Sequence, residues 1–460
     1  MGQNRGLYPS PPPRMSALPE ILADRLTLGE GADERVLAYR RGRPVTLATF
    51  HAEVRALAAA LPAGRHAVNL CEDRYLFLVG LCAVALRGQT TLLPPSRAPE
   101  IVAETMALHE EAYALGDAAS QPGVPRYWPL PQPLARQEGP RPWVSAGDVA
   151  VIGYTSGSTG RPKPYPKTWE AFRIGCRQNL QALADLWDPA APASVLATVP
   201  SQHMYGMEMS VILPLLGGVA IDDGRPLFPQ DVAQALVALP APRLLVTTPV
   251  HLRALVDAGV AMPEVAGLVS ATAPLSAELA RAAEACFGGE MREVFGSTET
   301  CVFASRRTAV DEAWTLLPGT TLSPRPDGTL VQAPHLHAPI LLADLVELAP
   351  GGRFVLRGRQ ADLLEIAGKR ASLADLTRRL LAVPGVRDGL VLQLDADEAG
   401  VRRIAALVVA PGMDEARLLA ALRPAVDPVF LPRRIRFVDA LPRAETGKLP
   451  RAGMLRLLQD

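Results

Sequence analysis

A glycine-rich and hydroxyl-rich segment at residues 149–163 has the composition of a phosphate-binding loop. It reads VAVIGYTSGSTGRPK. Gly157 and Gly160 permit backbone torsions that expose successive amide N–H groups, and a polyanion suits such a surface. The surrounding side chains add four hydroxyls and one ammonium, which belong to Thr155, Ser156, Ser158, Thr159 and Lys163.

The loop differs from the Walker A motif, because no Gly-x-x-x-x-Gly-Lys-Ser/Thr string occurs in the chain. Apolar, mostly β-branched residues at Val149–Ile152 predict a buried strand that ends at the loop. The alternative is an ordinary turn, since Ser and Gly are common in turns.

Four further segments carry groups that suit a nucleotide, and each has a simpler alternative. Phe295–Glu299 offers hydroxyls and a carboxylate for phosphate and Mg²⁺, or is only a capped helix start. Asp344, inside an apolar run, needs donors such as a ribose diol, a backbone amide or an arginine. Gly358–Asp362 is alternatively a charged turn. The loop that holds Lys448 is alternatively an exposed loop with a solvated lysine.

The composition is that of a globular protein with no overall preference for nucleic acid or lipid. Of 460 residues, 48% are hydrophobic, and 47 Lys and Arg balance 47 Asp and Glu, so any anion site is local. Five scattered cysteines without CxxC spacing argue against a disulfide framework or a zinc site and indicate a cytoplasmic protein. The longest apolar run, Leu76–Leu86, is too short to span a bilayer.

The order of predicted elements indicates an α/β fold. Helices at Thr46–Leu61 and Leu76–Leu86 alternate with strands at Ala67–Cys71 and Thr90–Leu93. Helices long enough for right-handed crossovers separate four later strands, which predicts doubly wound parallel sheets. These strands are expected at Ser194–Val199, Val219–Asp222, Arg243–Thr247 and Gly267–Ala271. N-caps are expected at Thr248 and Ser276.

Three parts are expected along the chain. Residues 1–20 form a disordered extension without a signal-peptide pattern. Residues 21–357 form a large domain of doubly wound sheets plus a small barrel-like part, and residues 358–460 form a smaller, mobile α+β domain. Between Gln121 and Trp143, seven prolines predict a surface connection without packed elements.

Taken in order, these segments resemble the motifs of the adenylate-forming (ANL) superfamily of acyl-CoA synthetases, adenylation domains and luciferases. Tyr154–Lys163 matches the YTSGSTGxPK phosphate loop, and Phe295–Glu299 matches the YGxTE motif. Asp344 matches the ribose-binding acid, Arg359 the arginine of GRxD, and Lys448 the lysine of PRTxxGK. The resemblance covers nearly the whole chain.

The resemblance implies a two-step acid–thiol ligase. An aryl, fatty or β-hydroxy carboxylate attacks the α-phosphorus of ATP and releases pyrophosphate. A phosphopantetheine thiol, on CoA or an acyl carrier protein, then takes the acyl group from the adenylate. Mg²⁺ is implied as a cofactor, and rotation of the small domain separates the two steps. The resemblance implies neither a nucleic-acid partner nor a membrane-spanning segment.

The resemblance also assigns residue roles. Lys448 bridges the carboxylate and the phosphate, Thr298 contacts the α-phosphate, Glu299 and Thr159 hold Mg²⁺, and His203 gates the acid site. Residues assigned to the rest of the nucleotide are Thr155, Ser156, Gly157, Ser158, Thr159, Gly160 and Lys163 in the phosphate loop, Ala271, Thr272 and Ala273 at the adenine-side strand end, Phe295 against the adenine, its neighbours Gly296 and Ser297, and Asp344 and Arg359 at the ribose.

Several positions depart from the family pattern and keep two alternatives open. Ala361 replaces the usual hinge acid, Glu365 a usual lysine, and Pro164 the usual glycine after the loop. A degenerate relative that binds ATP or an acyl-adenylate without turnover is one alternative. A stand-alone amino-acid adenylation domain is the other, although the segment after His203 offers only Glu208 to hold an α-amine.

The segment between Val302 and Gly351 is short, which resembles a compact subgroup found with aryl-polyene and xanthomonadin-like pigment pathways. The walls of the acid pocket are expected to include four dispersed residues, namely His203, Met207, Ala271 and Phe303.

Overall fold

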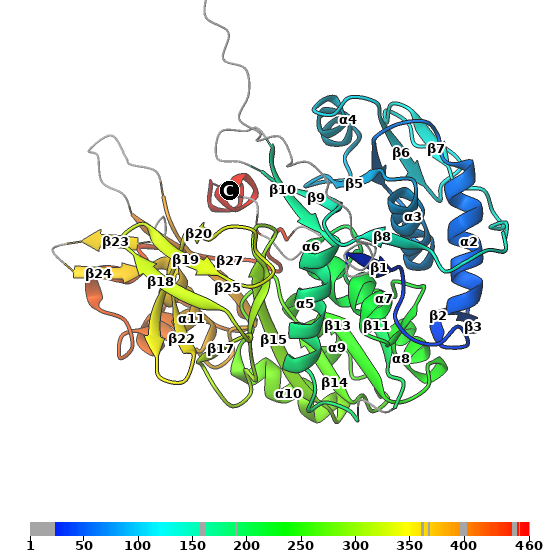
Figure 1. The fold of residues 1–460 in the computed structure, drawn as a ribbon. Helices are drawn as coiled ribbons and strands as arrows, with labels where there is room; N and C mark the ends of the chain where they lie inside the picture. The colour runs from blue at the N-terminus through cyan, green and yellow to red at the C-terminus, as the bar shows by residue number, and fades with distance from the viewer. Residues whose placement is uncertain are drawn as a thin grey trace, which may run out of the picture.

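The computed structural model describes residues 24–156, 162–188, 191–359, 363–366, 369–394, 403–443, 449 and 451–459. It confirms the predicted α/β class: two large sheets carry helices on their faces, and smaller sheets follow toward the C-terminus (Figure 1). No helix in these ranges is long and apolar enough to cross a bilayer.

The first sheet has six strands in the order β10-β9-β5-β4-β6-β7. Five run parallel, and β10 returns antiparallel to β9. The strands are β4 (His66–Asn69), β5 (Thr90–Leu93), β6 (Ala112–Gly116), β7 (Tyr127–Pro129), β9 (Val149–Ser156) and β10 (Pro162–Thr168). The accompanying helices are α2 (Leu47–Ala60), α3 (Arg74–Leu86) and α4 (Pro99–Ala107). The predicted βαβ unit is therefore present.

The second sheet has eleven strands in the order β21-β22-β17-β16-β15-β14-β13-β11-β12-β2-β3. Neighbours from β2 to β15 along this order run parallel, and β16, β17, β22 and β21 continue it antiparallel. The bounds are β2 (Val36–Arg40), β3 (Arg43–Thr46), β11 (Ser194–Ala197), β12 (Ala220–Asp222), β13 (Arg243–Thr247), β14 (Gly267–Ser270), β15 (Glu290–Ser297), β16 (Cys301–Arg306), β17 (Trp314–Leu316), β21 (Asp344–Ala349) and β22 (Arg353–Arg359).

Helices between these strands make the crossovers that the sequence predicts. They are α5 (Trp169–Ala182), α6 (Met204–Met207), the π-helix η1 (Glu208–Ile212), α7 (Leu213–Leu216), α8 (Pro229–Ala238), α9 (Pro249–Asp257) and α10 (Ala277–Phe287). The predicted N-caps are confirmed: Thr248 accepts a hydrogen bond from His251 N (3.3 Å), and Ser276 accepts one from Leu279 N (3.1 Å).

Smaller elements complete the described chain. β18 (Thr321–Arg325), β19 (Gly328–Gln332) and β20 (Ile340–Leu342) form one sheet, and β1 (Arg25–Thr27) pairs with β8 (Trp143–Ser145). The C-terminal elements are β23 (Leu363–Ile366), β24 (Lys369–Ser372), α11 (Leu373–Leu381), β25 (Asp388–Gln393), β26 (Ile404–Val409), α12 (Glu415–Leu422), the 3₁₀ turn η3 (Pro428–Phe430), β27 (Arg434–Phe437) and α13 (Arg451–Gln459).

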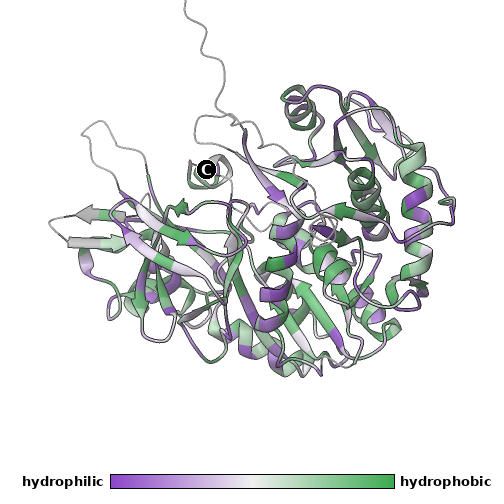
Figure 2. Ribbon diagram, viewed as in Figure 1, coloured by the Kyte–Doolittle hydropathy of each residue, from purple (hydrophilic) through white to green (hydrophobic). Residues whose placement is uncertain are grey.

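Apolar residues concentrate in the strands of the parallel sheets, whereas helices such as α5 carry hydrophilic bands (Figure 2). Two hydrophobic clusters contain only residues from Leu364 onward. This separation suits an independent C-terminal unit, and the boundary near Gly358 stays a prediction.

Two expectations about element bounds need correction. The proline-rich stretch from Gln121 to Trp143 is not wholly unstructured, because β7 within it extends the first sheet beside β6; Pro129 is tolerated as the last residue of an edge strand. The strands leading to the two predicted nucleotide motifs are also longer than expected: β9 includes Thr155 and Ser156, and β15 runs through Phe295 to Ser297.

Candidate functional site

Strands β9 and β10 flank the predicted phosphate loop. They pair directly from Ser156↔Pro162 to Ile152↔Pro166, so the loop connects two adjacent strands. β10 contains prolines at 162, 164 and 166; it is an edge strand, where residues without an N–H can face outward without breaking the ladder. This explains why Pro164 is accommodated where the family has glycine.

The end of β9 lies against the turn that follows β15. A Cβ added at Gly153 would lie 2.8 Å from Thr298 Cγ2 and 3.1 Å from Met204 Cε. The absence of a side chain at Gly153 therefore lets the first sheet approach Thr298, although the two segments are far apart in sequence. The structure thus brings together one flank of the phosphate loop and the Thr298–Glu299 pair.

The turn at Ser297–Val302 is closed by reciprocal hydrogen bonds. Ser297 N donates to Thr300 Oγ1 (3.1 Å), and Thr300 N donates to Ser297 Oγ (3.2 Å). A Cβ at Gly296 would lie 2.1 Å from Cys301 O, so only glycine fits there. Thr298 and Glu299 lie half-buried in this turn.

An aromatic cluster supports the turn from β15. The Phe295 ring meets Phe303 edge-on, with ring centroids 5.2 Å apart, and lies 5.2 Å from Trp314. Phe303 was expected on the acid-pocket wall, but it packs into this cluster, separate from the cluster that holds Met207 and Ala271. Successive strand residues face opposite sides, so Val302 shares the Met207 cluster instead.

The predicted adenine-side segment begins where β14 ends. Thr272 has φ +81°, which is strained for a β-branched residue and is typical of functional sites. The buried hydroxyls Ser270 Oγ and Thr272 Oγ1 have no hydrogen-bond partner among the described residues. Such atoms fit the polar edge of a bound ligand.

Helix α6 positions His203 at the predicted acid site. His203 is the half-buried N-cap residue, and its carbonyl accepts from Met207 N (2.7 Å). Tyr205 Oη lies 2.8 Å from Val269 O and 3.1 Å from Thr247 O, which ties α6 to the carboxyl ends of β13 and β14. Ligands in open α/β sheets bind at such strand ends.

The predicted ribose residues lie opposite each other at the far edge of the second sheet. In the strand register, Asp344 on β21 lies opposite Arg359 on β22, and Asp344 is buried. The sheet is continuous from this pair through β17 and β16 to the Thr298 turn on β15.

Several predicted residues lie outside the described residues. They are Gly157, Ser158, Thr159, Gly160, Ala361 and Lys448. Their roles stay predictions, as does the side-chain role of Glu365. In the described ranges no group of three or more His, Cys, Asp or Glu side chains could hold a metal. Glu299 fits the alternative mode for Mg²⁺, in which one carboxylate, waters and substrate phosphates supply the ligands.

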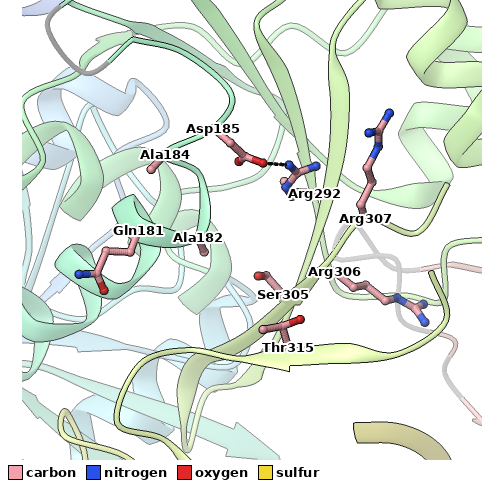
Figure 3. A pocket seen from close by; sticks show the side chains of 9 residues that line it. All are labelled: Gln181, Ala182, Ala184, Asp185, Arg292, Ser305, Arg306, Arg307 and Thr315. Atoms are coloured by element: carbon pink, nitrogen blue, oxygen red, sulfur yellow. Dashed lines mark hydrogen bonds and ion pairs between the residues drawn. The ribbon is translucent and has the colours of Figure 1, made fainter. Parts of the chain in front are cut away.

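A cavity of about 420 Å³ lies at the opposite ends of β15 and β16 from the Thr298 turn (Figure 3). Its three arginines each pair with a carboxylate: Arg292 with Asp185, Arg306 with Glu293, and Arg307 with Glu290. An anion would have to compete with these pairs, so the cavity is not assigned to the nucleotide.

Three contributors to the site were missed by sequence reasoning. Gly153 lies in the 149–163 segment but was given no role of its own, and Lys167 and His335 lie outside any motif; the fold places each of them at the turn. The sequence offered a signal for Lys167 alone: it is the second lysine of PKPYPK, in an otherwise proline-rich strand. Glu208 was considered only as an amine ligand; burial raises its pKa to about 7, and its carboxylate oxygens lie 3.1 Å from Val302 N.

Comparisons with known proteins identify the family of the chain. The family model described as AMP-binding enzyme matches residues 20–332. A 4-coumarate–CoA ligase from Rhodobacter capsulatus is 34% identical over 299 residues, covering 64% of this chain and 73% of the relative. A salicylyl-CoA synthase / salicylate adenylyltransferase from Streptomyces is 26% identical, covering 66% and 62%. The ATP-bound MatB structure from Rhodopseudomonas palustris has a TM-score of 0.78 at 20% identity, covering 93% and 96%.

Proposed function

Because the chain belongs to the AMP-binding enzyme family, as its motifs predicted, we propose that it activates a carboxylic acid with ATP. The products are an acyl-adenylate and pyrophosphate, and a phosphopantetheine thiol then receives the acyl group. Two relatives are, by name, an acid–CoA ligase and an acid–AMP ligase, which favours an enzyme over a degenerate binding protein.

The convergence of the two sheets supports this proposal most directly. Gly153, the residue directly before the Tyr154–Lys163 motif, lies against Thr298. On the neighbouring strand β10, Lys167 donates a hydrogen bond to Glu299 O. One triphosphate at this junction would meet loop amides from one sheet and the Thr298 hydroxyl from the other. A preorganised donor at a reacting phosphate is worth about 3–4 kcal/mol of transition-state stabilisation.

The chemistry needs charge neutralisation and alignment of two anions. Thr298 would donate to the α-phosphate, and Lys448 would bridge that phosphate and the attacking carboxylate. Glu299 and Thr159 would hold Mg²⁺, which neutralises phosphate charge when bound. Asp344 and Arg359 would hold the ribose, and Phe295 would orient the adenine.

An aryl acid is the proposed substrate class. The named substrates of the two relatives, 4-coumarate and salicylate, are both aryl acids. In this chain, Met207 and Ala271 belong to the main hydrophobic core, and His203 is the N-cap residue of α6; apolar walls of this kind would suit a planar apolar ring. CoA or an acyl carrier protein is the proposed acceptor.

Pyrophosphate release tests the proposal. The full chain is incubated with ATP, Mg²⁺ and a panel of aryl, fatty and amino acids, with and without CoA or a carrier protein. Acid-dependent release, strongest with aryl acids, is expected. Release that needs no acid, or ATP binding without release for any acid, would contradict the ligase assignment.

Two lysine variants sharpen that assay. Lys448→Ala is expected to lose adenylation by about 10²–10³-fold, the cost typical of removing one preorganised donor. Lys369→Ala is the matched control, because Lys369 has no assigned role in adenylation. Equal rates in the two variants would remove Lys448 from the mechanism.

A further inference from the structure

Lys167 is a buried lysine that contacts the predicted metal-binding turn. Its side chain is only 5% exposed, and its Nζ donates to the backbone carbonyl of Glu299. Burying an ammonium is costly unless it is hydrogen-bonded and paired. Lys167 lies on β10, so it joins the strand that leaves the phosphate loop to the residue expected to hold Mg²⁺.

Glu208 holds the far end of the same turn. The residue is 4% exposed, and both carboxylate oxygens lie 3.1 Å from Val302 N, with Asn179 Nδ2 at 3.4 Å. Glu208 opens the π-helix η1, a geometry common at functional sites. Lys167 is close enough that its charge opposes the effect of burial on the pKa of Glu208.

His335 holds the middle of the turn. Its Nε2 lies 2.7 Å from Thr300 O, and its Nδ1 lies 2.7 Å from Gln178 Oε1 on α5. Gln178 in turn donates from Nε2 to Pro318 O (2.6 Å). Backbone groups of Glu299, Thr300 and Val302 are therefore each bound by a side chain from a different part of the fold.

The turn needs this support because its backbone is unfavourable. Cys301 has φ +55°, and residues other than glycine in this region cost about 1–3 kcal/mol unless their surroundings hold them. None of the three supporting side chains carries an assigned role in the reaction. The turn they hold carries Thr298 and Glu299, whose alignment the chemistry depends on.

We propose that Lys167 and Glu208, assisted by His335, are positioning residues that hold the Ser297–Val302 turn so that Glu299 and Thr298 face the Mg²⁺–triphosphate. This inference rests on the proposed function. Lys167 couples the phosphate-loop strand to the metal-binding turn, and Glu208 fixes the turn where it enters β16.

The first test is Lys167→Met, which keeps the apolar stem and removes the ammonium. Calorimetric titration with ATP at several Mg²⁺ concentrations is expected to show half-saturation by Mg²⁺ about 10-fold higher than in the wild-type protein, the usual cost of losing a group that orients a metal ligand. Tyr113→Phe is the control, since it removes one buried hydrogen bond, to Gln89 Oε1 (2.7 Å), away from the turn. If Lys167 only stabilised the fold, the substitution would lower the fraction of protein that binds ATP by the same factor at every Mg²⁺ concentration.

A pair of Glu208 variants tests the proposal if Lys167→Met fails to fold. Glu208→Gln keeps an acceptor for Val302 N and is expected to retain the wild-type Mg²⁺ dependence within about 3-fold, whereas Glu208→Ala is expected to weaken it about 10-fold. Unchanged Mg²⁺ dependence in Glu208→Ala, or in a folded Lys167→Met, overturns the inference. Wild-type protein that binds MgATP but releases no pyrophosphate contradicts the proposed function alone, because the binding test does not depend on turnover.

Discussion

Replacing Glu208 by glutamine is expected to change how the free energy of unfolding depends on pH. Burial raises the pKa of Glu208 from 4.5 to about 7. Below pH 4.5 the carboxyl is protonated in both folded and unfolded chains. As the pH rises toward 7, the unfolded chain releases this proton while the folded chain keeps it, so the wild-type protein loses stability. At about 1.4 kcal/mol per pKa unit, the loss totals about 3 kcal/mol.

Urea denaturation at pH 5, 6, 7 and 8 measures this effect. The difference in unfolding free energy between wild type and Glu208→Gln is expected to shift in favour of the variant across that range, because glutamine does not titrate. Glu100→Gln, at an exposed position in α4, controls for the loss of one surface charge. A constant difference between wild type and Glu208→Gln from pH 5 to pH 8 would refute the assignment of a protonated, buried Glu208.

Two further substitutions probe the junction between the sheets. Gly153→Ala is expected to lower the adenylation rate at least about 10-fold, because the new methyl group would lie 2.8 Å from Thr298 Cγ2 and displace it; Gly147→Ala, which meets no atom within 4 Å, should leave the rate unchanged, and equal rates would argue against the contact. Glu299→Gln is expected to raise the Mg²⁺ concentration for half-maximal pyrophosphate release about 10–100-fold, and a variant with wild-type Mg²⁺ dependence would remove Glu299 as a metal ligand.

The features that the sequence predicted well depend on short patterns of neighbouring residues. Thr248 and Ser276 cap their helices because a hydroxyl before a helical run satisfies the first free N–H groups. The parallel sheets follow from apolar strands alternating with helices, and the family follows from motifs of contiguous residues. Asp344 is buried, as the apolar run around it indicated, and its role at the ribose stays a prediction.

The remaining features depend on which strands become neighbours. In the sequence, Lys167 looks like a surface lysine; only the folded structure shows that it contacts Glu299 O. Phe303 looks like a pocket residue, but its position in the alternation of β16 directs it toward Phe295. The carbonyl that His335 contacts, on Thr300, is 35 residues away in the sequence. No local pattern encodes such contacts, because they form only when segments distant in the sequence become neighbours in the folded chain.

A crystal structure of the full chain with ATP, Mg²⁺ and an unreactive aryl acid analogue would test the central claim most directly. The triphosphate is expected between residues 155–163 and the Ser297–Val302 turn, with the α-phosphate within hydrogen-bond distance of Thr298 Oγ1 and Mg²⁺ on Glu299. A nucleotide bound elsewhere, such as the arginine-lined cavity beside Arg292, with Thr298 and Glu299 untouched, would contradict it.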